Sequence, residues 1–232
     1  MADRVIIVTA ASRGMGAEIA RKLHAEGYKL ALMSRSEDLE VVAKETGALI
    51  YFGSTTEKSD IEGLVSITIE KYGRIDGIVC NTGHPPKGEL LQLTIDQWQE
   101  GFDIALFHLI HLVKVATPYL EKSRGAVVSI SAFGAVEPSL DFPVSSVVRA
   151  ALGAFSKLYA DKYGEKGIRI NNVLPGFIDT FDVSDERLNL IPLHRAGKKT
   201  EIADTVAFLL SDSAGYITGQ NIRVDGGLTR SL

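Results

Sequence analysis

The chain has little cysteine, no long apolar run and no basic block. Cys80 is the only cysteine among 232 residues, which excludes an internal disulfide and a cysteine-based metal cluster. The net charge of −4 gives no indication of a nucleic-acid surface. No apolar run reaches the roughly 18–20 residues that a membrane-spanning helix requires. We therefore expect neither nucleic acid nor a membrane as a partner.

The rest of the composition is that of a globular protein. Hydrophobic residues make up 45% of the chain and charged residues 23%, enough to bury a substantial core. The first residues, MADRVIIV, become strand-like almost at once, without the architecture of a signal peptide. We expect one domain over residues 1–232 and a cytoplasmic location.

The first 35 residues alternate strand, loop, helix and strand. Residues 5–8 are β-branched and bounded by turn residues, as in a strand buried on both faces. Apolar residues then recur at helical spacing until Gly27. The loop between them, residues 9–16, can aim helix N–H groups at an anion. This is the context that a dinucleotide-binding fingerprint requires.

The same alternation continues along the whole chain. It predicts an α/β fold: a single doubly wound, Rossmann-like domain whose seven-stranded, mostly parallel sheet carries helices on both faces. The expected strands are residues 5–8, 30–33, 48–52, 77–81, 126–131, 168–174 and 221–224. The longest helices are expected near residues 94–122 and 144–166.

Three motifs carry a family resemblance. Thr9-Ala10-Ala11-Ser12-Arg13-Gly14-Met15-Gly16 resembles the T-G-x-x-x-G-x-G loop of the short-chain dehydrogenases/reductases, with Ala10 in place of the first glycine. Cys80-Asn81-Thr82-Gly83 is similar to the family's N-N-A-G, and residues 175–180 to its P-G-x-x-x-T. The resemblance covers nearly the whole chain and implies a nicotinamide cofactor. The residues it assigns to cofactor binding are Thr9, Ala11, Ser12, Arg13, Met15, Ser34, Arg35, Gly53, Ser54, Asn81, Thr82, Gly83, Arg149, Pro175, Gly176, Ile178 and Thr180.

The end of the second strand favours NADP(H) over NAD(H). NAD sites place a carboxylate there for the ribose 2′-hydroxyl, whereas NADP sites offer arginine to a 2′-phosphate. Here Arg35 follows Ser34, and Arg13 in the glycine loop is expected on the other side of the same phosphate. The alternative is two solvated surface arginines. Gly53-Ser54 departs from the family, which often has aspartate and an apolar residue there.

The family's four catalytic side chains are all replaced. Its reduction chemistry relies on a tyrosine and a lysine one helical turn apart, a serine and an asparagine. Ser145 occupies the tyrosine position and Arg149 the lysine position, while Ala132 and Ala105 replace the serine and the asparagine. A shift of one residue would offer Ser131 as the serine.

The substitutions leave the proton donor open. No tyrosine lies between Tyr119 and Tyr159. Ser145 has neither the acidity of a phenol nor a lowered pKa, and Arg149 keeps a charge that does not titrate in the useful range. We include Ser145, Arg149 and His84 as candidate catalytic residues. His84, on a proline-rich loop, is either a proton donor or a merely exposed histidine; water and Asp141 are further candidate donors.

Three functions follow from this pattern. The first is an atypical NADP(H)-dependent oxidoreductase acting on a small molecule with a carbonyl, imine or conjugated alkene. The second is a pseudoenzyme, acting as a cofactor-binding sensor or as a subunit of an oligomer. The third is a purely structural interaction protein, supported only by Ala10 and Gly53. The short segment 181–190 corresponds to the substrate-covering region and suggests a modest or open pocket.

The two long helices are apolar around much of their circumference. Family resemblance implies a homodimer or homotetramer paired through them. His108 and His111 share a helix face at a spacing suited to metal binding, but no third ligand is evident in the sequence. We interpret them as ordinary helix-face residues and expect no metal site.

Overall fold

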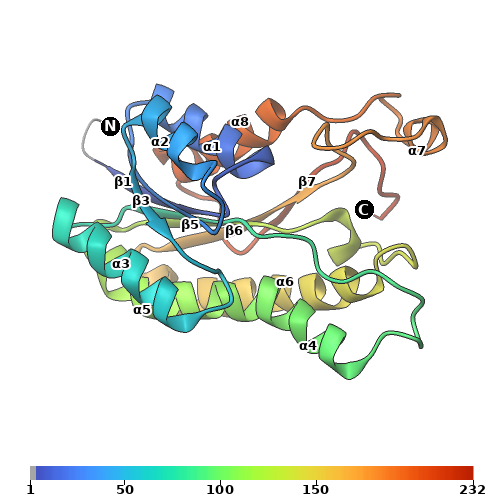
Figure 1. Cartoon of the computed structure of the whole chain (residues 1–232), viewed down its shortest axis with the longest axis horizontal. Coiled ribbons are helices and arrows are strands. Elements are labelled where there is room, and N and C mark those ends of the chain that lie inside the picture. The colour runs from blue at the N-terminus through green and yellow to red at the C-terminus, as the bar shows by residue number, and fades with distance from the viewer. Residues whose placement is uncertain (1–3, 232) are drawn as a thin grey trace.

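A seven-stranded parallel sheet forms the centre of the computed structural model, which describes residues 4–231 (Figure 1). The strand order is β3-β2-β1-β4-β5-β6-β7, and every neighbouring pair is parallel. The prediction of a doubly wound α/β fold is confirmed, and the sheet is wholly rather than mostly parallel. The strands are β1 Val5–Thr9, β2 Lys29–Ser34, β3 Leu49–Phe52, β4 Gly77–Cys80, β5 Ala126–Ile130, β6 Arg169–Pro175 and β7 Asn221–Val224.

Helices cover both faces of the sheet, as Figure 1 shows. One layer consists of α1 Gly14–Ala25, α2 Leu39–Thr46 and α8 Lys199–Leu210. The other consists of α3 Lys58–Tyr72, α5 His108–Ser123 and α6 Pro143–Tyr163. The shorter helices α4 Ile95–Phe102 and α7 Asp185–Leu190 lie toward the same end of the molecule, on the right in Figure 1.

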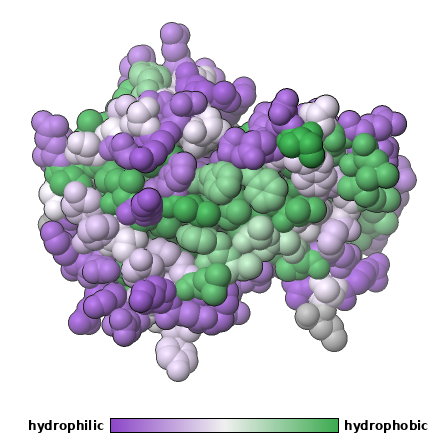
Figure 2. Space-filling view, turned by 90° about the horizontal axis from the view of Figure 1, so that it is seen from below, coloured by the Kyte–Doolittle hydropathy of each residue, from purple (hydrophilic) through white to green (hydrophobic). Residues whose placement is uncertain are grey.

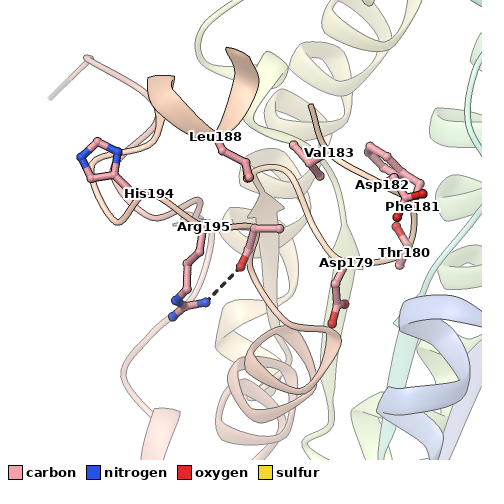
Figure 3. Close-up of a pocket in the computed structure, with 9 residues that line it drawn as sticks. Asp179, Thr180, Phe181, Asp182, Val183, Leu188, His194 and Arg195 are labelled. Atoms are coloured by element: carbon pink, nitrogen blue, oxygen red, sulfur yellow. Dashed lines mark hydrogen bonds between the residues drawn. The ribbon is translucent and has the colours of Figure 1, made fainter. Parts of the chain in front are cut away.

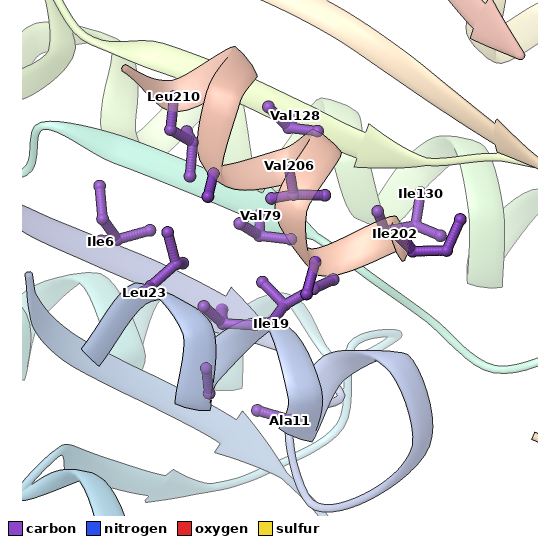
Figure 4. Close-up of a cluster of buried hydrophobic side chains, with 14 of the residues drawn as sticks. Ile6, Ala11, Ile19, Leu23, Val79, Val128, Ile130, Ile202, Val206 and Leu210 are labelled. Atoms are coloured by element: carbon purple, nitrogen blue, oxygen red, sulfur yellow. The ribbon is translucent and has the colours of Figure 1, made fainter. Parts of the chain in front are cut away.

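Two hydrophobic cores follow from the alternation of side chains along each strand. Ile6 and Val8 of β1 face one core, shown in Figure 4, where they meet Leu23 of α1 and Val206 of α8. Ile7, between them in sequence, faces the opposite core under α3, α5 and α6. Because both faces of the strand are buried, its sequence is continuously apolar rather than alternating.

The helix expected at residues 94–122 is interrupted. Thr94 caps α4 by accepting a hydrogen bond from the Gln97 N–H, while the Gln97 side chain accepts one from the Thr94 N–H. A π-helical turn, Asp103–Phe107, then joins α4 to α5. The helix expected at 144–166 is α6, followed by a 3₁₀ turn, Gly164–Lys166.

The run Ile95–Ser123 is long and apolar enough, by length and composition alone, to cross a membrane. Its packing explains this character, since one face of α5 belongs to the core beneath the sheet. The buried apolar side chains of that face are Leu109, Leu112, Val113, Ala116 and Leu120. This is the arrangement of a core helix in an α/β domain.

His108 is buried in α5, and its imidazole contacts the Cys80 thiol, with 3.4 Å between Nδ1 and Sγ. Burial, followed by the charge of His111, lowers the pKa of His108 to about 3. An unfolded histidine titrates near pH 6.5. The stability linked to this site is therefore fully present above about pH 6.5 and is lost as the pH falls toward about 3, because only the unfolded chain takes up the proton.

We predict that His108→Gln flattens the acid dependence of stability. Between pH 7 and about pH 4.5, the wild-type protein should lose about 2 kcal/mol more unfolding free energy than the variant. Urea unfolding at a series of pH values measures this difference. His111→Gln, on the same helix but half-exposed, is the matched control. Identical slopes for wild type and His108→Gln would contradict the prediction.

Candidate functional site

The strand order reverses between β1 and β4, and ligands of doubly wound sheets bind at the carboxyl ends of such strands. Thr9 and Asn81 close this point with a reciprocal pair of hydrogen bonds. The Thr9 hydroxyl donates to the Asn81 carbonyl over 2.7 Å and accepts from the Asn81 N–H over 3.1 Å. The Thr9 side chain is fully buried. Its hydroxyl therefore acts on Asn81 and holds the two strand ends together.

The glycine loop keeps its shape despite Ala10. Ala10 adopts a left-handed backbone with φ of 47°, the conformation that favours glycine. Its carbonyl accepts a hydrogen bond from the Asn81 side-chain amide over 3.2 Å. A Cβ on Gly16 would lie 2.3 Å from that carbonyl oxygen and 2.7 Å from the Asn81 nitrogen. Glycine is therefore required at position 16, whereas the loop tolerates alanine at position 10.

The start of α1 is suited to an anion. Arg13 is the N-cap residue of α1, and its side chain makes no capping hydrogen bond. Among residues 4–231, the first N–H groups of the helix therefore have no side-chain cap. The helix dipole adds positive potential at this end. Thr180, from the distant segment after β6, lies against the loop, since a Cβ on Gly14 would be 3.6 Å from its methyl carbon. Two of the predicted cofactor segments therefore meet here.

Ala11 and Met15 contribute to the loop through packing. The Ala11 side chain is fully buried in the core, and its N–H donates to the Met33 carbonyl over 3.1 Å. Met15 is half-buried against the same core. These contacts hold the loop against β2. Because the Ala11 side chain is buried, only the Ala11 backbone can contact a ligand.

Ser12 and Ser34 bring the two arginines to one place. The Ser34 hydroxyl donates to the Ser12 hydroxyl over 2.9 Å, which joins the glycine loop to the end of β2. The neighbours of these serines, Arg13 and Arg35, are both exposed. Within residues 4–231 neither forms an ion pair with a carboxylate. Both guanidiniums are therefore available to an anionic ligand.

The Asp60 side chain lies beside Gly53, the position where the family often has an aspartate. It comes from the first turn of α3, and its Oδ2 accepts a hydrogen bond from the Ser54 N–H over 2.8 Å. A Cβ on Gly53 would lie 2.8 Å from the Asp60 Cβ, so glycine permits this approach. The sequence analysis did not include Asp60 among the candidate site residues. The available signal was an acidic residue in the first turn of the helix that follows Gly53.

The segment after β6 is fixed by its backbone. The Gly176 N–H donates to the Val224 carbonyl over 3.1 Å, and a Cβ on Gly176 would lie 2.9 Å from the Asp225 Cα. Ile178 is buried and pairs with Gly197, which leaves its backbone, rather than its side chain, for a ligand. Pro175 ends β6 and is buried, while Thr180 is exposed.

Beyond β4, Thr82 connects the cofactor side to the π-helical turn. Its hydroxyl donates to the Ile104 carbonyl over 3.0 Å. Ala105, at the family's asparagine position, is buried within the turn. Single π-helical turns concentrate at functional sites. The π-helical turn therefore lies where the family's asparagine is replaced by Ala105. Gly83 and His84 follow Thr82 and are exposed.

Arg149 and Ser145 are in contact. The Arg149 Nε–H donates to the Ser145 hydroxyl oxygen over 3.2 Å, and Nη1 donates to the Ile130 carbonyl over 2.6 Å. Arg149 is only 5% exposed, and burial lowers its pKa to about 10, so the guanidinium stays charged at neutral pH. Because Ser145 accepts from the guanidinium, its own O–H is free to donate. The predicted pair of cation and hydroxyl is thus assembled one helical turn apart.

The positive charge of Arg149 acts on the His84 imidazole. His84 is exposed at the surface, but the part of its ring that is enclosed by protein, then the charges of Arg149 and Lys87, lower the pKa of His84. The imidazole is therefore mainly neutral at neutral pH, which makes it a poorer proton donor than an unperturbed histidine. Its position beside the arginine, rather than its acidity, connects it with the site.

Three further polar side chains mentioned in the sequence analysis, those of Ser131, Tyr159 and Cys80, are buried. The Ser131 hydroxyl is buried and has no hydrogen-bond partner in residues 4–231, so it does not replace the serine lost at Ala132. Tyr159 bonds to Thr117 over 2.6 Å, and burial raises its pKa to about 12. Burial also raises the pKa of Cys80 to about 12. None of these groups provides an accessible acid.

A pocket of about 520 Å³ lies between the segment after β6 and the loop that carries His194 and Arg195 (Figure 3). Arg195 forms a bidentate ion pair with Glu201, with N–O distances of 2.8 and 2.7 Å. The pocket contains Thr180 but not Ser145 or Arg149. Its lining residues are Asp179, Thr180, Phe181, Asp182, Val183, Leu188, His194, Arg195 and Ala196.

The comparisons with known proteins agree with this geometry. A family model described as Enoyl-(Acyl carrier protein) reductase matches residues 9–229. The chain therefore belongs to the short-chain dehydrogenase/reductase family of oxidoreductases. It is 34% identical over 239 residues to a 3-oxoacyl-[acyl-carrier-protein] reductase FabG of Staphylococcus aureus, with 96% of each chain covered. It is 29% identical to the Thermotoga maritima protein of the same name, with 97% of each chain covered.

We predict that Gly16→Ala damages both the loop and cofactor binding, because the new methyl meets a backbone carbonyl that cannot move alone. The expected loss of unfolding free energy is about 1–3 kcal/mol, and NADPH affinity should fall at least about tenfold, since the loop must shift. Thermal unfolding and a fluorescence titration measure the two effects. Gly164→Ala, where a Cβ meets nothing within 4 Å, is the control; a Gly16→Ala protein with wild-type affinity would refute the prediction.

Proposed function

We propose that the protein is an atypical NADP(H)-dependent oxidoreductase that acts on a small molecule bearing a carbonyl, imine or conjugated alkene. The contact between Arg149 and Ser145 carries this proposal, because it sets a buried cation against a hydroxyl at the positions where the family has lysine and tyrosine. Membership of a reductase family adds support. The site combines a cofactor cradle with a polarising group.

The residues around the switch point fit an NADP(H) molecule. Gly16 leaves space beside the uncapped start of α1 for a pyrophosphate. Arg13 and Arg35 would hold the 2′-phosphate, and Asp60 would accept from the adenine amine. The backbone near Ile178 and the Thr180 hydroxyl would hold the nicotinamide amide. The bound cofactor would supply a hydride.

Ser145 and Arg149 supply electrostatic stabilisation rather than a strong acid. The Ser145 O–H would donate to the substrate oxygen or nitrogen that becomes electron-rich. The permanent charge of Arg149 would stabilise that developing negative charge, and burial makes the interaction stronger than in water. The proton would then come from water, relayed through the Ser145 hydroxyl, because an unassisted serine is a weak acid.

A second candidate is a cofactor-binding protein without turnover. It is favoured by the enclosed Ser131 hydroxyl and by alanine at positions 132 and 105. Titration with NADPH and NADH, followed by a panel of ketones, imines and enones, distinguishes the candidates. NADPH consumption that falls about 10–1,000-fold in Ser145→Ala would support the oxidoreductase. Tight NADPH binding without consumption would favour the sensor, and no binding of either cofactor would favour a structural protein.

We predict that Arg13→Gln and Arg35→Gln remove cofactor selectivity. Each charge-assisted hydrogen bond to a phosphate contributes about 1.5–3 kcal/mol, so each variant should weaken NADPH about 10–100-fold and leave NADH nearly unchanged. Titrations with both cofactors measure the ratio. Arg21→Gln, within α1 and paired with Glu45, is the control. Equal losses for the two cofactors would rule out a 2′-phosphate site at these arginines.

We also propose that two or four copies associate through α5 and α6. A band of apolar side chains crosses this face of the molecule in Figure 2. Three large apolar side chains are exposed on these helices or at the junction with the π-helical turn: Phe107, Val147 and Leu158. Sedimentation at equilibrium tests the association. A monomeric wild-type protein at micromolar concentration would refute it, and Leu158→Glu should weaken a dimer that forms.

A further inference from the structure

Three phenylalanines converge near the start of α6, the helix that carries Arg149. Phe133 follows β5, Phe142 precedes α6 and Phe177 follows β6. The ring centroids of Phe133 and Phe177 are 5.6 Å apart, and those of Phe133 and Phe142 are 6.5 Å apart, both pairs edge to face. We call these three residues the aromatic wall. Edge-to-face contacts of this kind hold phenyl rings in fixed orientations.

Two cations border the aromatic wall. The Lys87 ammonium lies 5.0 Å from the Phe142 centroid. The Arg187 guanidinium, from α7, lies 5.1 Å from the Phe177 centroid and 5.8 Å from that of Phe142. Asp141 accepts a hydrogen bond from Arg187 over 3.1 Å. The Asp141 carboxylate is therefore paired with Arg187 and not with Arg149.

Two of the three residues of the aromatic wall, Phe133 and Phe142, lie on the segments that hold Arg149. Ile130, whose carbonyl binds Arg149, precedes Phe133 by one short turn, and Phe142 precedes Ser145 by the first turn of α6. The turn that begins at Phe133 packs on that helix start, since a Cβ on Gly134 would lie 2.9 Å from the Ser146 hydroxyl. Arg149 and Lys87 both lower the pKa of His84. Arg149, the aromatic wall and the Lys87 ammonium are therefore connected through the start of α6 and the turn that follows β5.

The charge of this site is unbalanced. Among the described residues, the Arg149 guanidinium bonds only to a carbonyl and a hydroxyl, both neutral. The raised pKa of Cys80 keeps its thiol neutral at neutral pH, and a histidine such as His84 supplies no negative charge in either protonation state. A buried charge is costly unless an opposite charge meets it. Ribose hydroxyls of a cofactor are neutral and do not remove this cost.

We propose that the substrate is a planar carboxylic acid, whose carboxylate meets the Nη2 edge of Arg149 and whose flat apolar part lies against the aromatic wall. This inference rests on the proposed function and specifies its substrate class. Arginine suits a carboxylate because its planar fork allows two parallel hydrogen bonds. The Lys87 ammonium adds favourable potential for an anion, whereas the charge of Arg187 is balanced by Asp141.

Binding of matched probes tests the proposal without turnover. Cinnamate and cinnamamide share one planar shape and differ in charge. Calorimetric titration into the protein saturated with NADP⁺ should show cinnamate binding at least about tenfold more tightly, as expected for a charge-assisted hydrogen bond. 3-Cyclohexylpropanoate, which keeps the charge but not the planarity, should bind more weakly than cinnamate. Equal affinity for cinnamate and cinnamamide, or no binding of either, would overturn the proposal.

Substitutions locate the effect. Arg149→Met should abolish the preference for cinnamate over cinnamamide, and Arg149→Lys should reduce it, because a buried lysine tends to lose its proton and lacks the planar fork. Phe142→Leu should reduce the advantage of cinnamate over the cyclohexyl acid and leave the charge preference intact. Lys71→Gln, a remote exposed cation on α3, is the control. The melting curve of Arg149→Met shows whether this variant folds. If it does not, the binding of the three probes to the wild-type protein and to Arg149→Lys still tests the carboxylate site.

The outcome is separable from that of the proposed function. A charge preference that depends on Arg149, together with no NADPH consumption on any acid, would leave the anion site standing and refute the oxidoreductase. Consumption of NADPH with neutral ketones alone, and an unchanged preference in Arg149→Met, would refute the carboxylate site and keep the oxidoreductase.

Discussion

The paired hydrogen bonds between Thr9 and Asn81 are the constraint on which the site depends. They fasten the ends of β1 and β4 at the point where the strand order reverses, and the Asn81 amide then holds the Ala10 carbonyl. Once that carbonyl is fixed, only glycine fits at position 16, and α1 must begin within a few residues. The buried side chains of Thr9 and Asn81 thus help to set where α1 begins. The start of α1 in turn sets where its dipole favours an anion.

The two halves of the site have diverged from the family to different degrees. The cofactor half preserves its shape, so that even Ala10 takes the left-handed conformation of the glycine it replaces, at a cost of about 1–2 kcal/mol. The candidate catalytic half differs from the family in its side chains, with Ala105 in a π-helical turn. This turn joins α4 to α5, so its shape serves the packing of these helices whatever side chain it carries.

Sequence patterns predicted the sheet and the glycine loop because both depend on local spacing. Strand boundaries agreed to within one or two residues, and the contact of Ser145 with Arg149 followed from helical periodicity. Asp60 and the aromatic wall were not predictable in this way, since they join residues from separate loops whose meeting depends on the complete fold. The buried state of the Thr9 hydroxyl was also beyond the pattern, because the motif gives a residue type and not the direction of its side chain.

Arginine in place of lysine limits what the site can do. A lysine with the burial of Arg149 would tend to lose its proton, and could then share in proton transfer. A guanidinium stays charged even with its pKa lowered to about 10, so it acts only by charge and hydrogen bonding. Serine in place of tyrosine removes the matching acid. The pair is consequently suited to reactions in which holding negative charge matters more than delivering a proton, and a substrate that brings its own negative charge satisfies the same requirement.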